Sequence, residues 1–87
     1  MPLMHGKADA IRVDLEGKGY QRDRWGHMKK YDEKRKSNVR YKFQKNTIRF
    51  EVKSKLGEWV RLRTYYINEI YKRLREGKLA KPSDLAS

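Results

Sequence analysis

Residues 39–64 read VRYKFQKNTIRFEVKSKLGEWVRLRT, and this stretch decides the fold. Apolar residues alternate with charged or polar residues over 39–44, again over 47–53 and again over 59–64. A period of two is typical of half-buried β-strands, because successive side chains of a strand point to opposite faces. The breaks at 45–46 and 54–58 then serve as turns. We therefore predict three consecutive antiparallel strands.

A single register satisfies the apolar face of all three strands. The predicted opposite pairs are Val39 with Val52, Tyr41 with Phe50, Phe43 with Ile48, Phe50 with Leu62 and Val52 with Val60. In this register every apolar residue meets an apolar partner. A slip of one residue would turn the apolar set of a strand toward water, so the pattern specifies the pairing strongly.

The opposite face of the predicted sheet is cationic. Its predicted rows are Lys42, Arg49 and Arg63, then Arg40, Glu51 and Arg61, and finally Lys53 beside Trp59. Glu51 partly neutralises the second row, whereas the first row has no carboxylate. Like charges directly opposite each other on neighbouring strands destabilise a sheet. A row of three cations therefore indicates a surface that meets an anion.

The charge of the whole chain supports the same interpretation. The net charge is +12, and residues 17–63 carry sixteen Lys and Arg against five Asp and Glu. Cations concentrated on one element are the electrostatic footprint of nucleic-acid binding. Solubility alone needs no such imbalance, and the ion-pair networks of thermophilic proteins mix both signs.

Residues 8–16 fit two kinds of secondary structure. Ile11, Val13 and Leu15 alternate with charged residues, as in a strand, whereas Ala8, Ile11 and Leu15 fit a short helix. The β-branched residues favour the strand. Residues 17–19 are predicted to form a turn or hinge.

A fourth strand is predicted around 25–31, paired with 38–44. Two registers are possible, and each puts a lysine on the apolar face. Matching Met28 to Tyr41 puts Lys30 against Val39, and matching Tyr31 to Val39 puts Lys29 against Tyr41. We therefore expect a bulge or irregular backbone in this segment.

The period changes after Thr64 to that of an amphipathic helix, whose apolar stripe is Ile67, Ile70, Tyr71 and Leu74. Thr64 is the predicted N-cap, and Gly77 the predicted stop. The helix is expected to cover the apolar face of the sheet, from Tyr41 and Phe43 out to Val60 and Leu62.

The predicted fold class is α+β: a small antiparallel meander of three to four strands packed on one C-terminal helix. Residues 1–19 are predicted as an N-terminal segment with a short strand and hinge, residues 20–79 as a single domain, and residues 80–87 as a flexible tail. A chain of 87 residues has room for one core.

The sequence supports no catalytic or metal chemistry. It has no cysteine, and its histidines, His5 and His27, lie far apart. It lacks a phosphate-binding loop and a nucleophile motif. We therefore predict a protein that is not an enzyme and has no catalytic residues, cofactor or metal.

The chain starts without the apolar region of a signal peptide and has no stretch long enough to cross a bilayer, so we expect a cytoplasmic protein with no membrane partner.

We predict a small basic nucleic-acid-binding protein that contacts phosphates through its cationic sheet face, with DNA favoured over RNA. The glycine that the RNA-recognition signature places between basic and aromatic residues is absent from 40–43. The predicted contacts are Arg40, Lys42, Arg49, Lys53, Arg61 and Arg63 on the strands, extended by Arg22, Arg24, Lys34, Arg35 and Lys36. Trp59 either stacks on a base or shields the sheet edge.

The alternative prediction is a protein-interaction module, an inhibitor or adaptor that docks an acidic partner through the same cations or through an exposed strand edge. The same edge could join two copies into a homodimer. The sequence leaves open whether a nucleic-acid partner is duplex DNA, single-stranded DNA or RNA.

Overall fold

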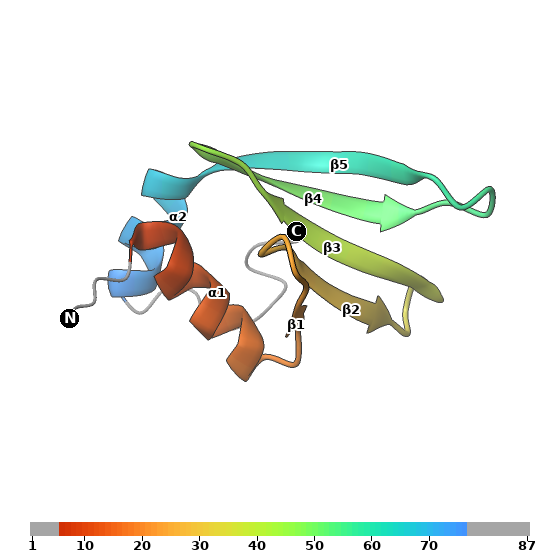
Figure 1. The fold of residues 1–87 in the computed structure, drawn as a ribbon, viewed down its shortest axis with the longest axis horizontal. Coiled ribbons are helices and arrows are strands. Elements are labelled where there is room, and N and C mark those ends of the chain that lie inside the picture. The colour runs from red at the N-terminus through yellow and green to blue at the C-terminus, as the bar shows by residue number, and fades with distance from the viewer. Residues whose placement is uncertain (1–5, 77–87) are drawn as a thin grey trace.

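The computed structural model describes residues 6–76, which form a five-stranded antiparallel sheet and two helices (Figure 1). The elements are α1 (Lys7–Gly17), β1 (Gln21–Arg22), β2 (Met28–Asp32), β3 (Ser37–Phe43), β4 (Thr47–Lys53), β5 (Trp59–Tyr66) and α2 (Ile67–Arg75). The strands lie in the sheet in chain order. The α+β class is confirmed, but the prediction missed the short strand β1 and the helix α1. The predicted stop at Gly77 and the predicted tail lie outside the described residues.

Residues 8–16 are helical, so the predicted strand was wrong. Ile11 and Leu15, four residues apart, are fully buried, whereas Val13 between them keeps 57% of its surface exposed. In a strand all three side chains would share one face. Lys18 and Asp14 also lie four residues apart, and they form an ion pair of 2.6 Å across one helical turn.

The end of α1 explains how the chain enters the sheet. The backbone N–H groups of Gly19 and Tyr20 donate to the carbonyls of Glu16 and Leu15. Gly19 has φ of +97°, a left-handed conformation that glycine adopts without strain. The turn delivers Tyr20, which is buried, into the core.

The hydrophobic core lies between the helices and one face of the sheet, which we call the inner face. Its buried side chains are Ile11, Leu15, Tyr20, Met28, Val39, Tyr41, Phe43, Ile48, Phe50, Ile67 and Ile70. Both helices lie toward one end of the sheet, and the β4–β5 hairpin extends beyond them (Figure 1). Val60 and Leu62 are 45% and 47% exposed, so the predicted cover by the C-terminal helix was wrong for these two residues.

The β3–β4 register matches the prediction at every predicted pair, from Val39 with Val52 to Phe43 with Ile48. The β4–β5 register matches only up to Glu51 opposite Arg61. The register shifts at the next position: Phe50 pairs with Arg63, so Leu62 is an extra residue in β5, a β-bulge. The predicted pair of Phe50 with Leu62 was therefore wrong.

The bulge inverts the faces of the second half of β5. Tyr65 now lies opposite Ile48 on the inner face, and Thr64 lies opposite Arg49 on the other face. Without the extra residue, Thr64 would cover Ile48 and Arg63 would face Arg49. The shift thus gives the core a large ring and separates two like charges, which is a physical reason for it.

The β2–β3 register pairs Met28 with Tyr41 and Lys30 with Val39, without the bulge that we expected. Lys30 is tolerated on the inner face because its ammonium group has partners there. The Nζ atom lies 5.4 Å from the centre of the Tyr20 ring and 3.5 Å from the carbonyl oxygen of Lys18. Its aliphatic stem can therefore face the core while the charge is stabilised by the aromatic ring and the carbonyl oxygen.

Strand β5 continues through Tyr66, two residues beyond the predicted end at Thr64, and helix α2 begins at Ile67. The backbone N–H of Ile67 donates to the carbonyl of Asn46 at 3.0 Å, which ties the start of the helix to the β3–β4 turn. Thr64 lies within the strand, so its prediction as N-cap was wrong.

Candidate nucleic-acid interface

The face of the sheet opposite the helices, the outer face, is covered by no other described helix or strand. The register assembles its side chains into rows across the strands. One row holds Lys29, Arg40, Glu51 and Arg61, the next Lys42, Arg49 and Thr64, and a third Tyr31, Asn38, Lys53 and Trp59. We call the six cations of these rows the cationic face: Lys29, Arg40, Lys42, Arg49, Lys53 and Arg61.

Half of the predicted contact residues lie together on this face. They are Arg40, Lys42, Arg49, Lys53, Trp59 and Arg61. Arg24 lies before β2 in a turn, with its guanidinium 5.2 Å from the Trp25 ring. Lys34 and Lys36 are exposed in the β2–β3 turn.

Two further predicted contacts lie on the helix side of the sheet. Arg63 is opposite Phe50 because of the bulge, so the row that combined it with Lys42 and Arg49 was wrong. Arg22 pairs with two carboxylates of α1, at 3.1 Å from Asp9 and 3.3 Å from Glu16.

Arg35 is likewise turned away from the outer face. It forms an ion pair of 2.7 Å with Asp32, and its guanidinium lies 5.4 Å from the centre of the buried Phe50 ring. Phe50 belongs to the inner-face core, so the loop folds this arginine over the core side.

A fixed ion pair lies at the centre of the cationic face. Nε of Arg40 donates to Oε1 of Glu51 at 2.7 Å, and Glu51 is only 5% exposed. The guanidinium carbon of Arg40 lies 4.2 Å from the centre of the Trp59 ring. Removing one partner of such a pair leaves a buried charge without compensation, so Glu51 and Arg40 hold each other in place. Arg40 thereby positions Trp59.

The remaining cations of the face are mostly uncompensated. Lys29 lies 3.4 Å from Asp23. Within residues 6–76 no carboxylate comes within ion-pair distance of the other four, which are Lys42, Arg49, Lys53 and Arg61. These four charges are available to an anionic ligand.

His27 borders the face beside Lys42, and its Nδ1 accepts a hydrogen bond from the backbone N–H of Phe43 at 3.1 Å. Burial lowers the pKa of His27, and the charges of Arg40, Lys42 and Arg12 lower it further, against the opposing effect of Asp23. Protonation of Nδ1 would remove the acceptor for Phe43. The folded state therefore favours the neutral imidazole.

We expect the free energy of unfolding to fall as the pH drops below the ordinary histidine pKa of about 6.5. Because the pKa of His27 is lower in the folded state, the unfolded chain binds more protons in the interval between the two pKa values. Stability then rises with pH across that interval and is lost on acidification. Urea unfolding between about pH 7.5 and 5 measures it, above the range where aspartates titrate.

His27→Gln is the control for this pH effect, because glutamine offers an acceptor oxygen but does not titrate. The variant should lose the part of the pH dependence that belongs to His27. Identical pH profiles for the two proteins would contradict the assignment.

Sequence reasoning missed several residues of the outer face. Lys29 and Tyr31 lie on the outer face because Met28 pairs with Tyr41. The same pairing puts Lys30 opposite the buried Val39, which made this register look unfavourable from the sequence. Tyr66 reaches this face only through the bulge, which no signal in the sequence indicates.

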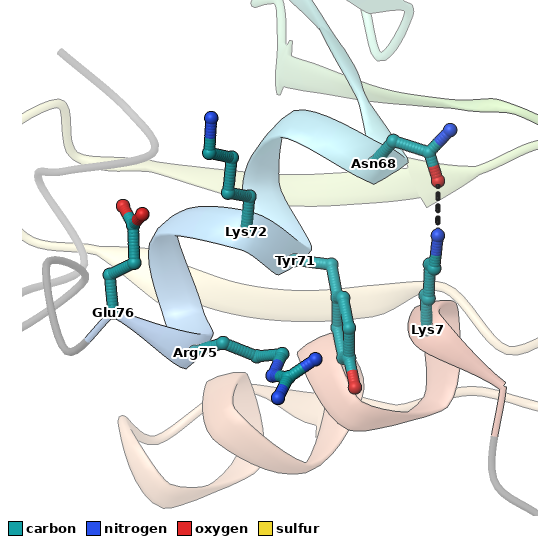
Figure 2. A pocket seen from close by; sticks show the side chains of 6 residues that line it. All are labelled: Lys7, Asn68, Tyr71, Lys72, Arg75 and Glu76. Carbon is teal, nitrogen blue, oxygen red and sulfur yellow. Dashed lines mark hydrogen bonds between the residues drawn. The ribbon is translucent and has the colours of Figure 1, made fainter.

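A second group of cations lies on the helical side of the domain, around an open pocket of about 450 Å³. The pocket is lined by Lys7, Asn68, Tyr71, Lys72, Arg75 and Glu76. Nζ of Lys7 donates to Oδ1 of Asn68 at 3.0 Å, and Tyr71 and Arg75 of α2 point toward α1 (Figure 2). Because the helices pack on the inner face, this group is separate from the cationic face.

The described part of the chain shows no cluster of three or more His, Asp or Glu side chains that could hold a metal ion. None of its helices has the length and apolar character needed to cross a membrane. Comparisons of the chain with protein-family models, with curated protein sequences and with solved structures find no match.

Proposed function

We propose that the protein binds nucleic acid by laying its cationic face against the phosphates. One observation carries the proposal: Lys42, Arg49, Lys53 and Arg61 lie without carboxylate partners, among the described residues, on three adjacent strands of one open face. Arginine can donate to two phosphate oxygens at once, and lysine supplies a point charge. Release of counterions from the nucleic acid would supply much of the affinity.

DNA is the form that we favour, since the glycine of the RNA-recognition signature is missing from 40–43. The contacts in the proposal are to the backbone, so they carry little information about base sequence. The protein would accordingly bind many sequences with similar affinity.

The affinity for DNA is expected to fall steeply with salt. If the four unpaired cations each neutralise one phosphate, the logarithm of the association constant should change with the logarithm of the salt concentration with a slope of about −4 for duplex and about −3 for a single strand. Fluorescence anisotropy of labelled DNA over a salt series measures this slope. A slope near zero would contradict phosphate neutralisation.

A second candidate function follows from β5, the long strand at the edge of the sheet. A partner could add a strand there, and the arginines of β5 would suit one with acidic side chains. Two results together would favour this candidate: the protein pulls down one acidic partner after nuclease treatment, and it carries no nucleic acid when purified. Nucleic acid that co-purifies, seen as a high ratio of absorbance at 260 nm to that at 280 nm, would favour the first.

A further inference from the structure

Aromatic rings lie around the cationic face. Tyr31 on β2 and Trp59 on β5 are at opposite ends of one row, with Asn38 and Lys53 between them. Tyr66 shares the outer face at the other end of β5. Tyr31 is 53% exposed and Tyr66 is 66% exposed. Large aromatic side chains exposed on a charged face offer flat apolar surfaces beside the cations.

The Trp59 ring is held in place before any ligand arrives. It lies against Arg40 at 4.2 Å, and Arg40 is bonded to the buried Glu51 at 2.7 Å. Nζ of Lys53 lies 5.8 Å from the same ring. A ring that is already ordered costs little conformational entropy when a ligand stacks on it.

The width of the face argues against duplex DNA as its preferred ligand. The strands β2 to β5 span about 14 Å between the outermost two, at about 4.8 Å for each step. The major groove is about 12 Å wide and takes a helix or a two-stranded ribbon. A face of four strands is therefore too broad to enter the groove.

Against the outside of a duplex, the aromatic rings would have no partners. The flat faces of the bases are stacked on one another inside a duplex, and only base edges are exposed, at the floor of the grooves. Tyr31, Trp59 and Tyr66 would then remain in water, or clash with the backbone. A single strand exposes its bases and phosphates together, which matches rings and cations on one surface.

We infer that the outer face takes single-stranded nucleic acid in preference to duplex, an inference that rests on the proposed function. Phosphates lie on Lys42, Arg49 and Arg61, and bases stack on Tyr31, Trp59 or Tyr66. The bases of single-stranded DNA and of single-stranded RNA can both stack on aromatic rings, so the experiment below includes both. The choice between them depends on contacts to the 2′-hydroxyl.

The test compares labelled oligonucleotides of about 12 nucleotides, as single-stranded DNA, single-stranded RNA and duplex DNA, at one salt concentration. We expect single strands to bind at least about 10-fold more tightly than the duplex. Tyr31→Leu combined with Tyr66→Leu should weaken single-strand binding by at least about 30-fold and leave duplex binding within about threefold.

Tyr31→Phe combined with Tyr66→Phe is the matched control, because it keeps both rings and removes only the hydroxyl groups. It should bind single strands within about threefold of the original protein. Thermal melting of both double variants shows whether each is folded; since the two tyrosines are exposed, we expect little change. If the leucine variant fails to fold, Tyr66→Leu alone replaces it.

The outcomes separate the inference from the proposed function. Two outcomes would overturn the inference while the proposed function stands. One is equal affinity for duplex and single strands, and the other is unchanged affinity of the leucine variant for single strands. No binding to any of the three oligonucleotides would overturn both. Loss of single-strand binding in the leucine variant but not in the phenylalanine variant would support both.

Discussion

Lys42→Glu combined with Arg49→Glu is expected to reduce the affinity for DNA by at least about 100-fold. The two residues lie directly opposite each other on the outer face, on the neighbouring strands β3 and β4. Both lack a carboxylate partner within the described residues, so each is free to bind a phosphate. The substitutions remove two charge-assisted hydrogen bonds and put two negative charges against the ligand. Fluorescence anisotropy at fixed salt gives the affinity.

Lys72→Glu combined with Arg75→Glu provides a control with the same change in net charge. Both residues belong to α2 and line the pocket on the helical side of the domain (Figure 2). Charges on the far side of the domain are largely screened at physiological salt, so we expect a loss of no more than about threefold. Equal losses from the two double variants would show that net charge alone attracts the ligand. Full binding by the first variant would exclude the outer face.

Leu15→Ala should lower the free energy of unfolding by about 3 kcal/mol, within the usual range for a buried leucine. The Leu15 side chain is fully buried between α1 and the sheet. Small domains of this kind have a total stability of about 5–15 kcal/mol, so the loss is a large fraction of it. Urea unfolding, followed by circular dichroism, measures the difference.

Val13→Ala is the matched comparison for this substitution. Val13 lies two residues away and keeps 57% of its surface exposed, so its truncation should change stability by less than about 0.5 kcal/mol. A strand over 8–16 would bury both side chains on one face and make the two losses similar. Similar losses would therefore contradict the helix α1.

The part of the fold that the sequence predicts well is the part with unbroken alternation. In β3 and β4, each apolar residue has a charged or polar neighbour on both sides, and the register follows directly. Residues 8–16 are too short for such a test, because apolar residues at 11 and 15 fit a period of two and a helical turn equally. Only the exposure of Val13 separates the two, and burial depends on the tertiary fold.

The candidate site was predictable to the same extent. Arg40, Lys42 and Arg49 follow from alternation on the central strands, and the structure brings them together. Arg63 could not be placed, because a single extra residue in β5 reverses its face. The side chain of Arg22 is held by ion pairs with carboxylates of α1, a helix that was not predicted from the sequence.

The extra residue Leu62 also affects how the domain meets copies of itself. Arg61 and Arg63 flank the bulge and lie on opposite faces of β5, so the free edge carries positive charge above and below its backbone. Two such edges brought together would place guanidinium groups on both sides of the seam, where they repel. The irregularity therefore discourages the pairing of two β5 edges, and it does so without a proline or a covering helix.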